Sequence, residues 1–237
     1  MEDLSETQFF ELPQELIWKM LYYLPPRDAM QVCLTHQKAA NIICKDNNFW
    51  YEKIWRDFGD VYELDMEDIP VKDRFGTYKQ YWEDAHEKLI LCAERGTVEC
   101  VESLLWLGID LDHQNKWGHT ALMFASQHGH TDVVRLLLEH GAKPNIQNRW
   151  GTTALIWTSA VGYADVVRLL LEHRADPDIR NSAGATSLLL ASQRGHVDIV
   201  QLLLERGANP DFQDYLNRTA FDWALRRGHM DIVRLLS

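Results

Sequence analysis

The chain has 237 residues, of which 46% are hydrophobic and 25% are charged, and its formal net charge is −11. This composition is typical of globular proteins, and the apolar runs are shorter than the roughly 20 residues that a membrane-spanning helix needs. The acidic balance argues against a protein whose whole surface binds nucleic acid.

The acidity is concentrated in the N-terminal third, since residues 1–84 hold 9 Lys and Arg against 17 Asp and Glu, whereas the remainder holds 15 against 18. The acidic start lacks the basic and apolar regions of a secretory signal, and the final RLLS contains no prenylation motif. The four cysteines, which form no C-x-x-C pair, predict reduced, partly buried thiols in an intracellular protein: Cys33, Cys44, Cys92 and Cys100. Cys33 and His36 have no second pair of matching spacing, so we predict no metal site.

Residues 12–28, LPQELIWKMLYYLPPRD, predict a short helix with apolar side chains on nearly every side. Pro13 fits the first turn of this helix, and Pro25 and Pro26 end it. A second helix is expected from about Arg27, and a third begins after Asp46 or Asn47. Three short helices form a small core, so the surplus of large apolar side chains indicates a protein interface.

Residues 10–57 resemble an F-box. The matching motifs are LP-x-E, an apolar helix, YLP-x-x-D, a V-C pair and a late D-x-x-FW, and the one departure noticed is Ala29, where the family most often has Leu. The resemblance implies binding to the Skp adaptor of cullin–RING (SCF) ubiquitin ligases. The implied adaptor-binding residues are Leu12, Pro13, Leu16, Ile17, Met20, Leu21, Leu24, Pro25, Val32 and Trp50.

An acidic connector follows the predicted F-box. Residues 57–76 contain Pro70 and are predicted to be mostly irregular. In residues 77–89 the apolar residues again have helical spacing, which predicts a helix. We expect this helix to pack between the F-box and the segment that follows, holding the two modules rigidly.

The second half of the chain repeats with a period of 33 residues. Gly96, Gly129, Gly162, Gly195 and Gly228 are evenly spaced, and so are Gly118, Gly151, Gly184 and Asn217. The shared pattern T-x-L…A…GH-x-D-VV-x-LLL-x-x-GA-x-P resembles the ankyrin repeat, which implies two short helices and a β-turn finger per repeat.

The predicted fold is therefore all-α: a three-helix F-box module followed by an ankyrin-repeat α-solenoid with short β-turn fingers. The expected divisions are 8–57 for the F-box, 58–84 for the connector and packing helix, and 85–237 for the repeats. The repeats divide into a weak one at 85–114 and clear ones at 115–147, 148–180, 181–213 and 214–237.

The repeat pattern leads to specific expectations for several of its positions. Gly129 and its equivalents are expected to end the first helix in the left-handed conformation, and Arg174 replaces Gly at another such position. The TPLH motif is eroded to TALM, TALI, TSLL and TAFD, which leaves the bonding between repeats open. We expect the column Phe124, Trp157, Leu190 and Trp223 to belong mainly to the inter-repeat core, and the histidines of the GH pairs, His130, His196 and His229, to be structural.

The resemblance places the exposed, variable positions on the finger tips and the concave end of each first helix. Among twenty such positions there is no Asp or Glu, six are Lys or Arg, and three are Trp or Tyr. The predicted target-binding residues are Lys116, Trp117, His128, Arg149, Trp150, Arg194, Tyr215, Arg218, Arg226 and Arg227. The other ten positions are His119, Gln127, Thr152, Ala160, Val161, Ser182, Ala183, Ala185, Gln193 and Leu216.

Arg and aromatic side chains dominate protein-binding hot spots, so this surface predicts a protein partner with an acidic, partly apolar segment. A solvated face without a ligand is the plainer alternative. Nucleic acid is less favoured because the basic stripe is short.

No phosphate-binding loop, G-x-S-x-G or H-E-x-x-H motif is present, so we expect no enzymatic activity and no cofactor. The combined resemblances imply a substrate receptor of an SCF ligase in the cytoplasm or nucleus of a eukaryotic or host cell. Similar pairings of the two modules occur in large DNA viruses, bacterial effectors and some eukaryotic proteins. Two alternatives therefore stay open: a decoy that occupies the adaptor or sequesters a host factor, and a scaffold that uses the repeats alone.

Overall fold

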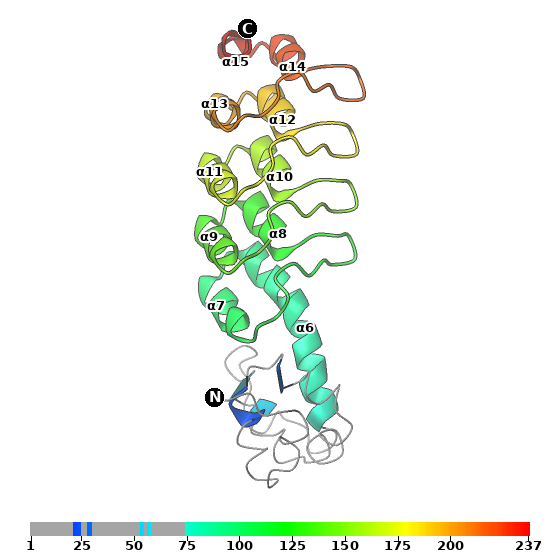
Figure 1. Cartoon of the computed structure of the whole chain (residues 1–237), viewed down its shortest axis with the longest axis vertical. Coiled ribbons are helices and arrows are strands. Elements are labelled where there is room, and N and C mark those ends of the chain that lie inside the picture. The colour runs from blue at the N-terminus through cyan, green and yellow to red at the C-terminus, as the bar shows by residue number, and fades with distance from the viewer. Residues whose placement is uncertain (1–20, 25–27, 30–52, 55, 58–73) are drawn as a thin grey trace, which may run out of the picture. The chain divides into compact units, whose positions relative to one another are not determined.

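Figure 1 shows a computed structural model of the chain, which describes residues 21–24, 28–29, 53–54, 56–57 and 74–237. The chain divides into two compact units: a first unit of residues 1–88 and 102–110, and a second unit of residues 89–101 and 111–237. The regular elements of the described residues are all helices, which confirms the all-α class for this part of the chain. No helix in it is both long enough and apolar enough to span a membrane.

The first long element is α6 (Arg74–Arg95). The sequence predicted a packing helix over 77–89 and a separate first repeat from residue 85, but the structure continues through both as one helix of 22 residues. The physical reason is that no Pro or Gly interrupts the segment after Gly76. The boundary between the two units, after Lys88, falls within α6.

The predicted F-box lies mostly outside the described residues. Leu21 and Tyr22 are helical, as are Asp28, Ala29 and the described positions between 53 and 57. These positions fall within the three helices expected from the sequence, but the three-helix module itself stays a prediction.

The repeats consist of helix pairs stacked one above the next, each followed or preceded by a finger that projects to the same side (Figure 1). The elements are α7 (Val98–Trp106), α8 (Ala121–His128), α9 (Thr131–Glu139), α10 (Ala154–Val161), α11 (Ala164–Glu172), α12 (Ser187–Arg194), α13 (Val197–Glu205), α14 (Ala220–Arg227) and α15 (Met230–Leu235). The first helices pack against one another along the stack, as α8, α10, α12 and α14 do, and the second helices α9, α11, α13 and α15 form a parallel row.

Each of these first helices begins and ends by the same local chemistry. Thr120 adopts an extended conformation and its hydroxyl accepts a hydrogen bond from the Met123 N–H, and Thr153, Thr186 and Thr219 repeat this cap. Gly129 ends α8 with φ 74°, and its three equivalents are likewise left-handed. The predicted glycine caps are therefore confirmed.

The GH pairs join each repeat to the one before it. The His130 ring donates from Nε2 to the Glu94 carbonyl at 3.0 Å, and a Cβ on Gly96 would lie 2.5 Å from the same ring. His196 and His229 make the equivalent bonds two and three repeats further on, at 3.4 and 3.3 Å. These histidines are structural, as predicted.

The eroded TPLH motif is accommodated by packing. Met123, Ile156 and Leu189 occupy the His position of that motif and are at most 2% exposed. Bonding between repeats comes instead from side-chain acceptors such as the Asp112 carboxylate, which accepts from the Lys143 N–H at 2.8 Å, and Asn145, which accepts from the Asp176 N–H. Asp178 continues this series with the Asn209 N–H.

Cys92 and Cys100 form a disulfide across the turn between α6 and α7, with their Cα atoms 6.0 Å apart. The prediction of reduced thiols is wrong for this pair. The sequence spacing of eight residues is not one of the usual disulfide or metal motifs, and only the reversal of the chain between the two helices brings the side chains together.

Candidate protein-binding surface

A single Asn or Asp side chain shapes each finger. Asn115 Oδ1 accepts hydrogen bonds from the Trp117 and His119 N–H groups at 2.9 and 3.0 Å. Asn148, Asn181 and Asp214 do the same in the next three repeats. Such local side-chain bonds favour turns, so the two residues after each acceptor are fixed at the finger tip.

Backbone hydrogen bonds join each tip to the next. The Arg149 N–H donates to the Trp117 carbonyl at 3.2 Å, Ser182 to Trp150 at 2.8 Å, and Tyr215 to Ala183 at 3.1 Å. We call the tip residues 116–117, 149–150, 182–183 and 215–216 the finger row. Because each tip is joined to the next by a backbone hydrogen bond, the side chains of the finger row are held in a fixed order.

A second ladder runs behind the row. Gln114 Nε2 donates to the Gly118 and Gln147 carbonyls at 2.7 and 3.0 Å, and Gln147 repeats this pattern one repeat later. Arg180 takes the same place in the third repeat and donates from Nη2 to the Gln213 carbonyl at 2.8 Å. The ladder was not predicted, and its signal was the recurrence of Gln or Arg every 33 residues.

The aromatic end of the row consists of Trp117 and Trp150. Their indole rings are stacked with centroids 6.1 Å apart, and they remain 45% and 50% exposed. The ammonium group of Lys116 lies 5.4 Å from the Trp117 ring centroid. Two large stacked apolar surfaces beside a cation are the composition of an interface anchor.

His119 lies against Trp150 of this pair. Its ring contacts Phe124, Trp150 and Trp157 with centroid distances of 5.2, 5.6 and 4.8 Å. Both ring nitrogens are buried and have no hydrogen-bond partner among the described residues. Burial therefore lowers the pKa of His119 below its usual value.

The arginine end of the surface, which we define as Arg194, Arg218, Arg226 and Arg227, lies on the third and fourth repeats. The guanidinium carbons of Arg218 and Arg227 lie 4.8 and 5.9 Å from the ring centroid of Trp223. The Trp223 indole N–H donates to Asp214 Oδ2 at 2.8 Å, which fixes the ring.

Asp214 is the buried carboxylate nearest to this end. Burial raises its pKa, but the hydrogen bonds from Trp223, Arg218 and Leu216 and the charge of Arg218 outweigh that effect and leave the pKa below its usual value. The carboxylate is thus committed to holding the finger and Trp223. In the described part of the chain, none of the four arginines forms an ion pair.

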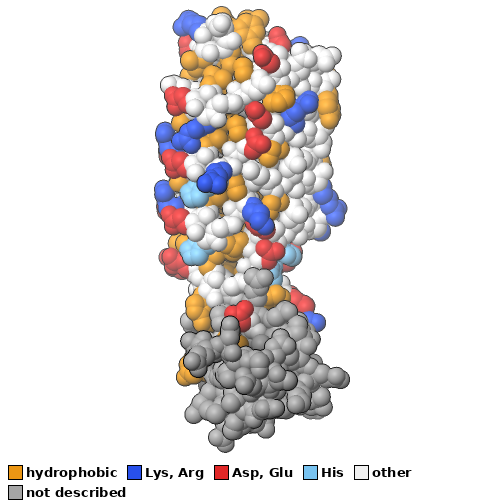
Figure 2. Space-filling view, in the orientation of Figure 1, with side chains coloured by type: hydrophobic (Ala, Val, Ile, Leu, Met, Phe, Trp, Pro, Cys, Tyr) orange, Lys and Arg blue, Asp and Glu red, His pale blue; other side chains and the backbone are white. Residues whose placement is uncertain are grey.

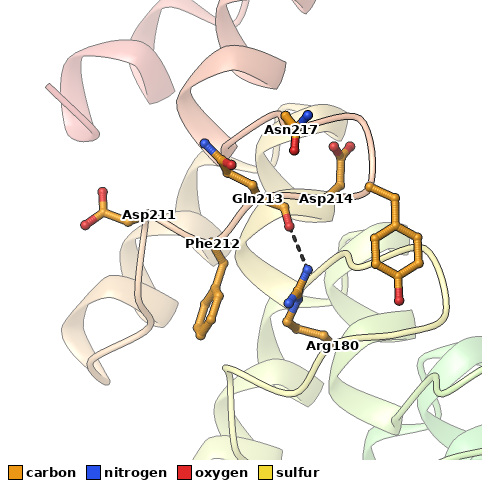
Figure 3. Close-up of a pocket in the computed structure, with 7 residues that line it drawn as sticks. Arg180, Asp211, Phe212, Gln213, Asp214 and Asn217 are labelled. Atoms are coloured by element: carbon orange, nitrogen blue, oxygen red, sulfur yellow. Dashed lines mark hydrogen bonds between the residues drawn. The ribbon is translucent and has the colours of Figure 1, made fainter.

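A cavity of about 380 Å³ lies between the third and fourth fingers, and Figure 3 shows its lining. The Arg180 guanidinium and the Phe212 ring, 5.8 Å apart, form one wall, and Asp214, Tyr215 and Asn217 belong to the fourth finger. Arg180 and Asp214 already bond to the fingers, so the cavity is a recess in the finger ladder beside the candidate surface.

The ten predicted target-binding residues all have solvent access. Nine are exposed and Arg218 is partly exposed. Of the other ten positions, Thr152 and Ala185 are buried at 7% and 4% exposure and are therefore not part of a contact surface. The column Phe124, Trp157, Leu190 and Trp223 is partly exposed throughout, so it forms the border between the core and the candidate surface.

The surrounding surface has a different charge pattern. The outer helices α9 and α11 carry Arg135, Glu139, Arg168 and Glu172 as exposed residues, and Figure 2 shows basic and acidic side chains close together along this side. The absence of carboxylates from the twenty candidate positions is therefore local.

Only two of the predicted adaptor-binding residues fall within the described part of the chain. Leu24 is partly exposed, whereas Leu21 is 1% exposed and belongs to the interior of the first unit. The remainder lie outside the described residues: Leu12, Pro13, Leu16, Ile17, Met20, Pro25, Val32 and Trp50.

The first unit contains a buried charged network that was not predicted from the sequence. The fully buried Lys53 ammonium contacts Asp57 Oδ2 at 2.8 Å and donates to the Leu24 carbonyl at 3.0 Å, and the Tyr78 hydroxyl donates to the same carboxylate at 2.8 Å. The network joins Leu24 to α6. Its only sequence signal was the spacing of Lys53 and Asp57, since Tyr78 lies 21 residues further on.

No group of three or more potential metal ligands occurs among the residues that the structure describes. A comparison with families of known proteins matches residues 89–181 and 173–237 to ankyrin repeats (3 copies). A comparison with curated proteins gave no match. The matched segments span more than half of the sequence and coincide with the stacked helix pairs and fingers, so the chain belongs to the ankyrin-repeat family.

Proposed function

We propose that this protein is a non-catalytic substrate receptor of an SCF ubiquitin ligase. The N-terminal segment docks on the Skp adaptor, and the repeats bind the target protein. The chain performs no chemistry in this role, since it raises the effective concentration of the target near the charged ubiquitin carrier.

The observation that carries the target-binding half is the fixed row of exposed aromatic and cationic side chains. Trp117 and Trp150 are stacked but half exposed, and the arginine end has no ion-pair partner among the described residues. Ankyrin repeats support the coarser statement that this chain binds a protein. The adaptor-binding half is supported by the motifs from Leu12 to Trp50.

Affinity capture from eukaryotic cells with cullin ligase activity blocked tests both halves. Wild-type protein is expected to retain the adaptor and a target. The double variant Leu16→Asp/Leu24→Asp should lose the adaptor and keep the target. The triple variant Arg149→Glu/Arg194→Glu/Arg226→Glu should keep the adaptor and lose the target.

A matched control reverses the same number of charges away from the candidate surface, on α9, on α11 and at the end of α13, by Arg135→Glu/Arg168→Glu/Arg206→Glu, and should retain both partners. Retention of the adaptor by the Leu16→Asp/Leu24→Asp variant would sink the receptor proposal. Retention of the target by the first triple variant would show that the repeats bind through another surface.

The alternative is a decoy that occupies the Skp adaptor without promoting ubiquitination. The N-terminal motifs favour it equally, because a decoy binds the same adaptor. Reconstituted ubiquitination separates the two roles. A receptor promotes ubiquitin transfer to the captured target, whereas a decoy blocks transfer to other substrates of the adaptor.

A further inference from the structure

The candidate surface is chemically divided along the stack. The first two fingers carry the stacked Trp117–Trp150 pair, and the fourth repeat places the Arg218 and Arg227 guanidinium groups at a single indole ring. Between them, the tip of the third finger is formed by Ser182 and Ala183, which are exposed, small and uncharged. A ligand that matches this order has an apolar part, a neutral part and an acidic part.

We propose that the target segment binds in two parts: an apolar side chain, aromatic or proline, on the Trp117–Trp150 pair, and an oxyanion, carboxylate or phosphoryl, at the Arg218 and Arg227 guanidinium groups beside Trp223. This inference rests on the proposed target-binding role of the repeats and names the kind of segment that they select.

The anion site is built around Trp223. The ring is held by the 2.8 Å hydrogen bond from its indole N–H to Asp214. The guanidinium carbons of Arg218 and Arg227 lie 4.8 and 5.9 Å from the ring centroid. Guanidinium groups stacked on an aromatic ring keep their in-plane N–H donors free for an acceptor. Planar donors suit carboxylate and phosphate groups, which accept paired hydrogen bonds.

Three aspartates lie in the same repeat, and each already has a partner. Asp231 pairs with Arg234 at 3.2 Å. Asp214 accepts from the Trp223 indole and from two backbone N–H groups. Asp222 accepts from the Thr219 N–H and hydroxyl in the capping box of α14. The charge of Arg218 acts on Asp214, but neither Arg218 nor Arg227 forms an ion pair among the described residues, and an acidic ligand would supply one.

The spacing of the two sites follows from the stack. Adjacent packed helices lie about 8–10 Å apart, so the step of two repeats from Trp150 to Trp223 separates the sites by about 16–20 Å along the stack. An extended chain covers about 3.3 Å per residue, which places the apolar and acidic residues of the target about five or six residues apart.

The neutral third finger favours a polypeptide over nucleic acid. A single-stranded nucleic acid carries a phosphate at every nucleotide and binds best to a continuous basic groove. Ser182, Ala183, Ala160 and Val161 interrupt the positive charge in the middle of this surface. A polypeptide with an uncharged spacer fits that interruption.

A peptide library displayed against the full chain tests the proposal without the adaptor. Selected peptides are expected to contain an aromatic residue or proline and an acidic cluster separated by about five or six residues. Synthetic copies should lose about tenfold or more in affinity when the spacer is shortened to about two or lengthened to about twelve residues. A copy with phosphoserine in place of glutamate distinguishes a phosphoryl ligand from a carboxylate ligand.

Variants assign each part of the peptide to its site. Arg218→Glu/Arg227→Glu should weaken the acidic peptide by about tenfold or more but leave a peptide without its acidic cluster unaffected. Trp117→Ala should weaken both peptides, and the control Arg135→Glu/Arg168→Glu should change neither. Circular dichroism verifies that each variant is folded.

Several results would overturn the proposal: no peptide selected, selected peptides without a fixed spacing, or equal binding by the Arg218→Glu/Arg227→Glu variant. If a single-stranded oligonucleotide bound more tightly than the peptides and lost its binding in the same variants, the ligand of this surface would be nucleic acid and not a polypeptide. If the peptide proposal is wrong, the chain still binds the Skp adaptor. If the receptor role is wrong, the chain does not bind the adaptor, so the two failures are distinguishable.

Discussion

At the residue scale, Arg174 shows what a single side chain costs when it occupies a glycine position. It adopts φ 64°, and the equivalent Gly108, Gly141 and Gly207 adopt φ 67°, 92° and 82°. The alignment with glycines raised the question of a left-handed Arg174, and the structure shows that conformation. Nothing lies within 4 Å of a Cβ built on Gly141 or Gly207, so the penalty at this position comes from the backbone and not from crowding.

Arg174→Gly is therefore expected to raise the free energy of unfolding by about 1 kcal/mol. Urea denaturation followed by circular dichroism measures this change. The reverse substitution Gly141→Arg should lower stability by a similar amount. A destabilised Arg174→Gly variant would mean that the exposed side chain makes a larger contribution than the strained backbone removes.

His119 is the second residue with an unusual environment. Its ring, whose two nitrogens are buried, contacts Phe124, Trp150 and Trp157, and Lys116 and Arg149 are the charged residues of the adjoining finger tips. Burial is the cause that acts on the pKa of this ring, and no carboxylate of the described residues contributes to it. The folded pKa therefore lies below the usual value of 6.5, because burial favours the neutral form.

Stability from neutral His119 is fully present above about pH 6.5 and declines as the pH falls toward the folded pKa, because only the unfolded chain is then protonated. His119→Phe should therefore raise the melting temperature more at pH 5.5 than at pH 7.5. Thermal unfolding of both proteins at the two pH values measures the difference. An equal effect at both values would contradict the assignment of a buried neutral imidazole.

At the scale of elements, the first helices share a buried serine that has no hydrogen-bond partner among the described residues. Ser126, Ser159 and Ser192 are fully buried and recur every 33 residues, where the following first helix packs against them. In α14 the same position is Leu225, which is 52% exposed. A small side chain is required where another repeat covers it, but the hydroxyl group is not.

Ser159→Ala is accordingly expected to stabilise the protein by about 1 kcal/mol, because a buried unpaired hydroxyl is removed without creating a large cavity. The neighbouring Thr158→Ala is the control, since Thr158 donates to the Ala154 carbonyl at 2.7 Å and its loss should be destabilising. Denaturant midpoints of the two variants give the comparison. Destabilisation by both would indicate that Ser159 has a partner that the structure does not show.

The elements also show how far the sequence predicts this structure. The caps Thr120 and Gly129 and the buried faces of the helices follow from local chemistry repeated every 33 residues, so their positions were predictable. The exposed tips Trp117 and Trp150 were identified because each fingertip has a fixed place in the repeat. Their stacking depends on the distance between fingers, which a sequence pattern does not contain.

Other features required the three-dimensional structure because they join residues without a periodic relation. The length of α6 reflects the absence of a helix breaker across a boundary between two sequence patterns. The Cys92–Cys100 disulfide depends on chain reversal between helices, and the Lys53–Asp57–Tyr78 network joins distant segments. The burial of Leu21, Thr152 and Ala185 depends likewise on their neighbours.

At the scale of the whole molecule, the proposed function requires two separate binding activities in one chain. The N-terminal motifs are apolar and lie in the acidic third of the sequence, whereas the candidate target surface is aromatic and basic. Since the two sets of residues do not overlap, each activity should be removable without affecting the other. This independence separates a receptor from a scaffold that uses the repeats alone.

The most direct test of the central claim is isothermal titration of the purified chain with the purified Skp adaptor. We expect a one-to-one complex that Leu16→Asp/Leu24→Asp abolishes and that Arg218→Glu/Arg227→Glu leaves unchanged. Absence of a complex, or a complex that survives the two leucine substitutions, would contradict the account.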